Sequence, residues 1–179
     1  MKVVKMEQKH IYFLRTGRIG FSKWGQEDIG LATELWGNAE VTRLICASGK
    51  FSEDDIKERL NREILNDRNH HVQYWPIFEL ATDDLIGCCG LRPCAENGYE
   101  IGFHLRPRFW GQGYAKEAAG AIIDYAFTTL QAHRLFAGHN PNNVASQKVL
   151  KALGFTYIGD EFYGPTGLYH PSYELIKSI

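Results

Sequence analysis

The sequence lacks an excess of either charge. Its 20 lysine and arginine residues nearly balance its 21 aspartate and glutamate residues, which gives a formal net charge of -1. A protein that binds a nucleic-acid backbone or an anionic membrane through electrostatics needs a basic surface instead. The charge balance therefore predicts that neither a nucleic acid nor a membrane is a partner.

Cysteine is scarce, with four residues: Cys46, Cys88, Cys89 and Cys94. No two of them have the two-residue gap of a zinc-binding pair, so we expect no metal. Cys88 and Cys89 are adjacent and would point to opposite faces of a strand. We interpret the four residues as reduced, buried thiols of a cytosolic protein.

Long apolar runs are missing as well. The segment Met1–His10 is polar and mixed in charge, so it lacks the apolar stretch of a signal peptide. No later segment is long and apolar enough to cross a bilayer. These two observations predict a cytoplasmic protein.

The length and composition favour one folded domain. A chain of 179 residues suits one domain with a substantial core and is short for two, so we expect a single domain over residues 1–179. Hydrophobic residues make up 44% of the chain and charged residues 23%, which is a globular composition and not a disordered one. We see no repeat, linker or low-complexity tract.

Hydrophobic periodicity predicts an α/β or α+β fold, with a mostly antiparallel sheet and helices packed on both of its faces. Helices are expected at 26–37, after the capping residue Ser52, at 113–130 and at 143–153. Strands are expected at 18–24, 74–80, 85–91, 99–105, 134–138, 155–161 and 167–176.

Residues 108–115 (Arg-Phe-Trp-Gly-Gln-Gly-Tyr-Ala) lie between a predicted strand and the most regular helical pattern in the chain. The first N–H groups of a helix have no partner within it, and the helix dipole adds partial positive charge there. Gly111 and Gly113 have no Cβ atom to hold a phosphate away from those groups. Taken alone, these glycines fit an ordinary loop end equally well. With the flanking segments, they predict an anion-binding loop.

Two common phosphate motifs do not fit this loop. The P-loop needs Gly-Lys followed by Ser or Thr, and no such triplet occurs here. The dinucleotide fingerprint needs three glycines after a first parallel strand, and Lys116 holds the third position. Both nucleotide interpretations are therefore poor.

The loop resembles a different cofactor signature. Arg-x-x-Gly-x-Gly at 108–113, with Ala115 two places on, is similar to the coenzyme A signature of the GNAT superfamily of N-acetyltransferases. The segments Leu85–Leu91 and Thr16–Arg18 resemble strand segments of its RimJ/RimL-like branch, which includes ribosomal-protein N-terminal acetyltransferases.

A second helix strengthens this resemblance. Asn143-Val-Ala-Ser146, followed by Leu150 and the pair Gly154-Phe155, is similar to the Asn-x-x-Ser…Leu…Gly-Phe segment of the same branch. The resemblance thus covers nearly the whole chain. It implies a GNAT-like sheet of about seven strands and acetyl-CoA as the acetyl donor.

The resemblance also implies how acetyl-CoA is held. Free backbone groups of a splayed strand near Phe103 and Leu105 would bind the pantetheine arm, and N–H groups of the loop would bind the pyrophosphate. Asn143 would hold the arm from the second helix. The implied cofactor-binding residues are Phe103, Leu105, Arg108, Gly111, Gln112, Gly113, Tyr114, Ala115, Lys116 and Asn143.

The implied reaction is direct attack of an amine on the thioester, with no acyl-enzyme. Because a free amine is already a good nucleophile, the protein supplies mainly position, deprotonation and oxyanion stabilisation. In this superfamily a carboxylate on the strand before the cofactor loop often acts through water as the base. Glu100 holds that place, with an ordinary exposed strand residue as the alternative. Ser146 is the candidate hydrogen-bond donor to the departing thiolate, with helix capping or packing as its alternative.

Two other positions bear on catalysis. His104 shares the face of Glu100, and its near-neutral pKa suits a base, although a hydrogen-bonded or solvated histidine fits equally. Leu150 stands where many relatives use a tyrosine as general acid. A non-catalytic acyl-CoA sensor or interaction module of the same fold is therefore the alternative function.

The resemblance leaves the acceptor open. In this branch the acceptor pocket is usually built from the loop after the first helix and from the final strands, here about 38–50 and 160–171. Protein N-termini, polyamines, free amino acids and aminoglycosides are all candidates. We expect a primary amine, with a protein or peptide α-amine favoured by the branch, and a monomer or homodimer.

Overall fold

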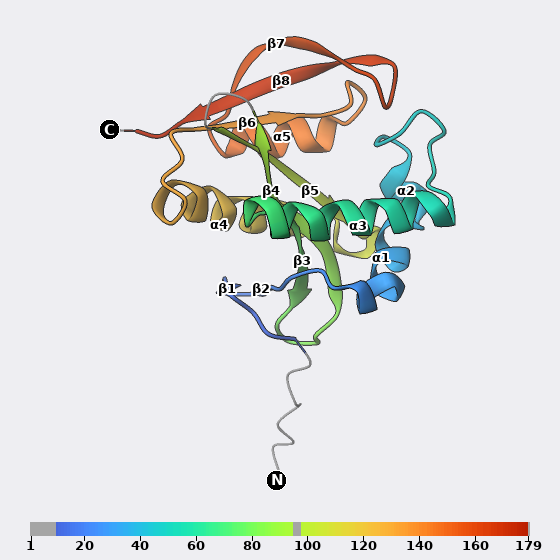
Figure 1. The fold of residues 1–179 in the computed structure, drawn as a ribbon. Helices are drawn as coiled ribbons and strands as arrows, with labels where there is room; N and C mark the ends of the chain where they lie inside the picture. Colours follow the sequence, from blue (N-terminus) through green and yellow to red (C-terminus); the bar gives the residue numbers. More distant parts are fainter. Residues whose placement is uncertain (1–9, 95–97, 179) are drawn as a thin grey trace.

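Eight strands form one mostly antiparallel sheet in the computed structural model, which describes residues 10–94 and 98–178 (Figure 1). The strand order is β1-β2-β3-β4-β5-β6-β8-β7, and β5 pairs with β6 in parallel. The strands are β1 Leu14–Arg15, β2 Ile19–Phe21, β3 Tyr74–Glu79, β4 Leu85–Cys94, β5 Gly98–Leu105, β6 Arg134–Gly138, β7 Thr156–Tyr163 and β8 Leu168–Ile176.

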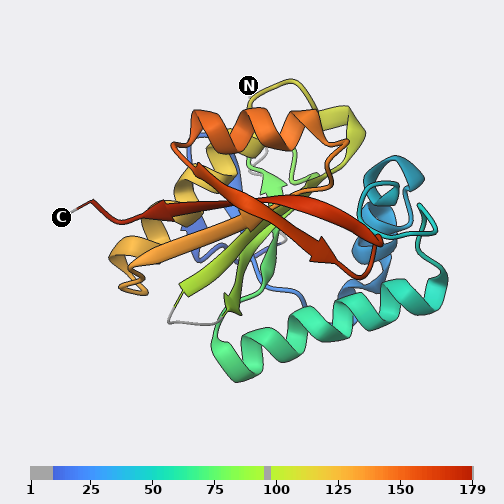
Figure 2. The ribbon, with the colours of Figure 1, turned by 90° about the horizontal axis from the view of Figure 1, so that it is seen from above.

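Helices cover both faces of this sheet, as predicted. Figure 2 shows α4 and α5 on one side of it and α3 on the other. The helices are α1 Ile29–Trp36, α2 Ala39–Thr42, α3 Glu53–His70, α4 Tyr114–Thr128 and α5 Val144–Ala152. The predicted mixed α/β architecture, a mostly antiparallel sheet with helices on both faces, is therefore confirmed.

Each face of the sheet has its own apolar core, because neighbouring strand residues point to opposite sides. Cys88 of β4 packs in a cluster that contains Trp36 of α1 and Leu60 of α3, whereas Cys89 packs in a second cluster that contains Ile122 of α4. All four cysteines are free. Cys88 and Cys89 are buried as expected, but Cys46 and Cys94 are partly exposed, so that part of the prediction was wrong.

The predicted caps explain where the longer helices begin. Ser52 accepts a hydrogen bond from the Asp55 N–H group at 3.1 Å, and the Asp55 side chain accepts one from the Ser52 N–H group at 2.7 Å. This reciprocal pair satisfies donors that the first turn of α3 leaves without a partner. Helix α4 begins instead after Gly113, whose φ of +82° lies in the left-handed region.

The N-terminal part differs most from the prediction. The strand expected at 18–24 is shorter, because Trp24 turns away and its N–H group donates to the Gln73 side chain at 2.7 Å. A two-residue strand, β1, precedes it and makes the sheet eight-stranded where about seven strands were expected. The helix expected at 26–37 is a 3-10 turn followed by α1, and the short helix α2 lies in a segment expected to be a loop.

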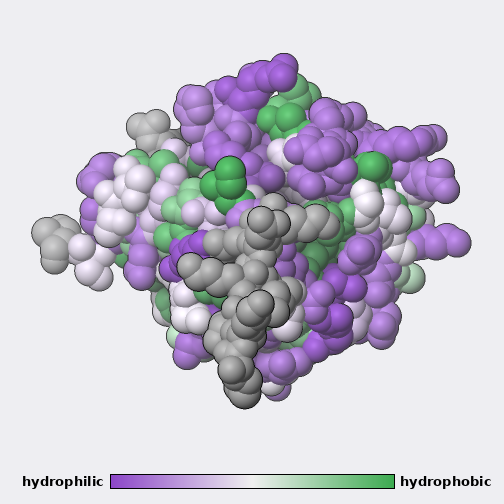
Figure 3. All heavy atoms as spheres, turned by 90° about the horizontal axis from the view of Figure 1, so that it is seen from below, coloured by the Kyte–Doolittle hydropathy of each residue, from purple (hydrophilic) through white to green (hydrophobic). Residues whose placement is uncertain are grey.

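The surface seen from below is mostly hydrophilic, and its apolar side chains lie in separate small patches (Figure 3). Among the residues that the structure describes, no helix has the length and apolar character needed to cross a membrane. The first nine residues, which the signal-peptide argument used, lie outside the described part of the chain.

Candidate active site

A cleft of about 930 Å³ opens where β5 and β6 separate. The two strands pair in parallel at Tyr99 with Leu135 and at Glu100 with Phe136, and residues further along both strands line the cleft. Past these pairs, backbone groups of β5 on this edge have no strand partner among the described residues. The splayed strand expected near Phe103 and Leu105 is therefore present.

One backbone carbonyl group at the end of β5 already has a hydrogen-bond partner within the protein. The indole N–H group of Trp110 donates to the Leu105 carbonyl oxygen at 2.8 Å, so that oxygen already has a partner. Phe103 and Leu105 both line the cleft. Trp110 thus ties the cofactor loop to the end of β5, which gives it a structural role.

The glycine loop has the conformation that an anion site needs. Gly111 has a φ of +71° and Gly113 a φ of +82°, a region that residues with a Cβ atom rarely adopt. The first hydrogen bond of α4 runs from the Glu117 N–H group to the Gly113 carbonyl oxygen. The N–H groups of Tyr114, Ala115 and Lys116 precede it, so they have no partner within the helix. All three residues, with both glycines, line the cleft.

Two residues of the signature do not reach the cleft. The Arg108 guanidinium forms an ion pair with Asp84 and lies over the Phe109 ring at 4.6 Å. The Gln112 side-chain amide donates to the Arg108 carbonyl oxygen at 2.7 Å. Neither residue lines the cleft. The role of both residues at the donor, where backbone N–H groups of the loop are expected to bind the pyrophosphate, therefore stays a prediction, and their side chains shape the loop from its outer side.

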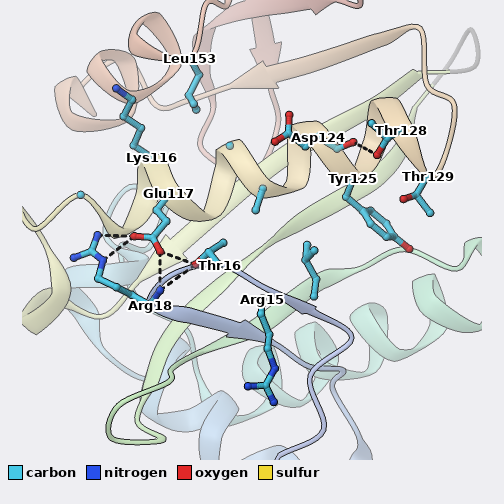
Figure 4. Close-up of a pocket in the computed structure, with 14 residues that line it drawn as sticks. Arg15, Thr16, Arg18, Lys116, Glu117, Asp124, Tyr125, Thr128, Thr129 and Leu153 are labelled. Carbon is cyan, nitrogen blue, oxygen red and sulfur yellow. Dashed lines mark hydrogen bonds and ion pairs between the residues drawn. The ribbon is translucent and has the colours of Figure 1, made fainter.

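A clamp from the N-terminal strands holds the loop, and sequence reasoning missed it. The Arg18 guanidinium bonds to Glu117 of α4 at 2.7 Å, donates to the Gln112 carbonyl oxygen at 3.1 Å and lies 4.1 Å from the centre of the Tyr114 ring. The Thr16 hydroxyl donates to the same Glu117 carboxylate at 2.5 Å. Figure 4 shows Thr16, Arg18 and Glu117 of this network at the edge of a second, more open groove of about 710 Å³.

Two candidate groups lie at the start of α5. The Asn143 side-chain oxygen accepts a hydrogen bond from the Ser146 N–H group at 3.0 Å, so Asn143 caps the helix. Both residues line the cleft. The Ser146 hydroxyl has no hydrogen-bond partner in the part of the chain that the structure describes. Leu150, also in the cleft wall, is only 2% exposed and offers no proton.

Glu100 lies in the cleft with one protein partner. Its Oε1 atom accepts a hydrogen bond from the Tyr74 hydroxyl at 3.2 Å. Within the described residues its Oε2 atom has no hydrogen-bond partner. The side chain is exposed, so a ligand in the cleft has access to it.

His104 is engaged in a way that disfavours a role as base. Its Nδ1 atom accepts a hydrogen bond from the Trp36 indole N–H group at 3.2 Å, and an indole can only donate. This leaves the proton of the neutral ring on Nε2. Burial, followed by the charges of Arg59 and Arg92, lowers the pKa of His104 well below its usual value. The hydrogen-bonded alternative for His104 is the one that the geometry supports.

The two predicted acceptor segments meet across the cleft. Glu40 and Arg43 line it from the first segment, and Glu161 and Tyr163 line it from the β7–β8 hairpin. The Ala47 N–H group donates to the Pro165 carbonyl oxygen at 2.7 Å, which links the two segments. This end of the cleft is thus bounded on both sides.

A family model described as an acetyltransferase (GNAT) domain matches residues 18–156. The chain belongs to the GNAT acetyltransferase family. The match covers most of the sheet, the glycine loop, α4 and α5. It confirms the family expected from the loop and from the Asn-x-x-Ser helix.

Known proteins agree with this assignment. The uncharacterized N-acetyltransferase p20 of Bacillus licheniformis is 33% identical over 150 residues, which are 82% of this chain and 83% of that protein. RimL, a ribosomal-protein α-N-acetyltransferase solved with coenzyme A, has a TM-score of 0.75 at 16% identity, with 90% of this chain and 95% of that chain covered. Spermidine N-acetyltransferase from Vibrio cholerae, solved with coenzyme A and spermine, has a TM-score of 0.73 at 17% identity, with 90% and 96% covered.

These findings confirm the GNAT family and the general activity. The chain is an acetyl-CoA-dependent acetyltransferase with structural neighbours in the RimL branch. The cleft fits such a substrate, because it is lined by helix-start N–H groups that have no partner within α4 and by a β5 edge that has no strand partner among the described residues.

The backbone conformation of the glycine loop predicts that a branched side chain at Gly111 weakens acetyl-CoA binding. No atom lies within 4 Å of a Cβ atom at this position, but valine rarely adopts a φ of +71°. The Gly111→Val loop must leave its anion-binding shape, so we expect at least about a tenfold weaker acetyl-CoA affinity by calorimetry, which corresponds to about 1.4 kcal/mol. Gly30→Val, on α1 with equal space and no positive φ, is the matched control. Equal affinity of both variants would place the pyrophosphate elsewhere.

His104 predicts a loss of stability in acid. The pKa of His104 is lower in the folded than in the unfolded chain. Below about pH 6.5 the unfolded chain therefore binds more protons than the folded chain. As the pH falls through this range, the free energy of unfolding decreases by up to about 1.4 kcal/mol per pH unit. His104→Gln should reduce this slope in urea unfolding between pH 5 and 7.5, whereas the exposed His133→Gln should not. Some slope should persist because burial also lowers the pKa of His170. An unchanged slope in His104→Gln would show that His104 is not held neutral.

Proposed function

We propose that this enzyme transfers the acetyl group of acetyl-CoA directly to a primary amine at the bounded end of the cleft. One observation carries the proposal: the same cleft contains the glycine loop at one end and the free Glu100 oxygen further in. The loop suits a pyrophosphate and the carboxylate suits an ammonium group. The thioester and the amine then meet between them.

We assign the binding of the donor to the backbone rather than to long side chains. N–H groups of Tyr114, Ala115 and Lys116 hold the pyrophosphate, since they point out of the helix start and carry its partial positive charge. The free edge of β5 near Phe103 pairs with the pantetheine amides as an added strand would. Asn143 has a side-chain N–H₂ group left over after capping α5, and this group donates to the same arm.

Glu100 acts as the base in this proposal. The acceptor arrives mostly as an ammonium ion, which the carboxylate attracts and deprotonates through a bridging water. The neutral nitrogen attacks the thioester carbon and the C–N bond forms, after which the nitrogen gives up its second proton to solvent and the C–S bond breaks. The thiolate leaves and takes up a proton from solvent. Ser146 donates a hydrogen bond to that sulfur as its charge develops, which replaces the tyrosine acid that Leu150 cannot provide.

The acceptor class follows from chemistry and from the relatives together. An α-amine has a pKa near 8, whereas a primary alkylamine has one near 10.4, so a larger share of an α-amine is neutral at pH 7 and a weak base suffices. RimL by its name acts on an α-amine of a protein, and the Vibrio cholerae enzyme on spermidine. We propose a protein or peptide α-amine as the preferred acceptor.

Thiol release from acetyl-CoA tests the function and the acceptor in one assay. The panel contains a short peptide with a free α-amine, the same peptide with an acetylated N-terminus, spermidine, an amino acid and an aminoglycoside. We expect thiol release with the free peptide and none above background with the blocked one. Acetyl-CoA binding without release for any amine would indicate the alternative, a non-catalytic acyl-CoA sensor.

Glu100→Gln should separate binding from turnover. We expect an unchanged affinity for acetyl-CoA and a turnover lower by about 10²–10⁴-fold, the range for a positioned general base. Part of the loss should return at high pH, where the amine arrives already neutral. Glu58→Gln, an exposed residue of α3 paired with Arg62, is the matched control and should keep full turnover. Normal turnover of Glu100→Gln at neutral pH would exclude Glu100 as the base.

A further inference from the structure

The strands beside Glu100 present a second side chain that serves the proposed reaction. We propose that Tyr74 is a positioning residue: its hydroxyl group holds the Glu100 carboxylate in the cleft, and a cluster of buried Arg59 and Glu63 with partly buried Arg92 holds Tyr74. The inference rests on the proposed function, because Tyr74 acts through Glu100.

A glycine on β5, Gly102, lets the Tyr74 side chain reach this strand. Tyr74 of β3 is paired with Gly90 of β4, and Gly90 is paired with Gly102 of β5, so the three residues form a row across the sheet. A Cβ atom at Gly102 would overlap the Tyr74 phenol. The ring therefore occupies space that a side chain on β5 would otherwise fill. From there its hydroxyl donates to Glu100, two residues before Gly102, at 3.2 Å.

Two arginines fix the plane of the Tyr74 ring. The Arg92 guanidinium carbon lies 4.2 Å from the ring centre, and that of Arg59 lies 5.4 Å from it. Both distances are within the range of a cation–π contact. Two guanidinium groups packed on one ring hold the ring in place, and both arginines line the cleft beside it.

Glu63 anchors both arginines and the tyrosine backbone. It is 0% exposed, and its Oε1 atom accepts hydrogen bonds from Arg59 Nε at 2.8 Å and Arg92 Nη2 at 2.9 Å. Its Oε2 atom accepts from the Tyr74 N–H group at 2.8 Å. A buried charge with several partners tolerates little displacement, because loss of a partner leaves it uncompensated. The support beneath Tyr74 is therefore rigid.

The positive charges of the two arginines are balanced by two carboxylates, Glu63 and Glu100. Two guanidinium groups face one buried carboxylate, so a positive charge is left over beside the cleft. Glu100 is the strand neighbour of Arg92 in the sheet register and supplies the second carboxylate. Burial, followed by the Glu100 charge, raises the pKa of Tyr74 well above its usual value. The phenol therefore stays protonated and remains a donor to Glu100.

This geometry leaves one oxygen of Glu100 for the reaction. Tyr74 occupies Oε1, whereas Oε2 has no hydrogen-bond partner among the described residues. Holding one oxygen limits the rotation of an otherwise exposed side chain. The free oxygen is then directed to the acceptor ammonium or to the bridging water, which is the position a base needs.

Tyr74→Phe tests this role, because it removes the hydroxyl and keeps the ring that packs on Gly102 and the arginines. With the best amine of the acceptor panel, we expect kcat to fall about tenfold, the order of effect of one lost hydrogen bond to a charged group. The affinity for acetyl-CoA should not change. In a Glu100→Gln background, Tyr74→Phe should lower kcat no further, since its effect passes through the carboxylate.

Tyr12→Phe is the matched control. Its hydroxyl donates to Asp83, and Tyr12 does not line the cleft. It should keep full turnover alone and add nothing in the Glu100→Gln background. Urea unfolding of Tyr74→Phe, Glu100→Gln and the double variant should also be non-additive, a readout that needs no turnover.

The outcomes separate the two claims. If Tyr74→Phe keeps full kcat, or lowers kcat by the same factor with and without Glu100, the positioning role is wrong while the proposed function stands. Additive unfolding energies would likewise overturn the contact. If the unaltered protein releases no thiol with any amine of the panel, the proposed function is wrong and the inference falls with it.

Discussion

The parallel contact between β5 and β6 is two residue pairs long, and the placement of the candidate groups depends on where it stops. A parallel pair needs a crossover connection, and here α4 makes that crossover directly after the glycine loop. The start of α4, the free edge of β5 and the start of α5 therefore border the same opening. A longer β5–β6 pairing would occupy the strand edge that the donor is proposed to use.

Surface ion pairs support one side of the opening, and a buried carboxylate supports the other. On the side of α4, surface ion pairs hold the loop: Arg18 with Glu117, and Arg108 with Asp84. On the side of α3, a buried carboxylate, Glu63, organises two arginines and Tyr74 beneath Glu100. Exposed pairs contribute little stability each and are screened by salt, whereas the buried group is costly to disturb. We thus expect the donor end to be more adaptable than the proposed base.

The parts of the site that sequence could predict are those with local signals. The loop at 108–115 was predictable because Gly111 and Gly113 precede a regular helix, and the Asn143–Ser146 segment because it caps one. Contacts between distant residues left no such signal. Arg18 and Glu117 are 99 positions apart, and the Trp36 bond to His104 joins different elements. Arg108 belongs to the signature, yet its partner Asp84 lies in another turn, so its direction was not predictable. Strand β1 has two residues, too few to show a period.

Backbone hydrogen exchange with and without acetyl-CoA tests the central claim, that the donor binds along β5 and at the start of α4. At saturating acetyl-CoA we expect two sets of amide groups to exchange at least about tenfold more slowly: those of residues 101–105 that face away from β4, and those of residues 114–116. New hydrogen bonds form there at groups that have no strand or helix partner among the described residues. Amides of α3, on the other face of the sheet, should exchange at an unchanged rate. Saturated binding with no protection in either segment would contradict the account, because the donor would then bind elsewhere.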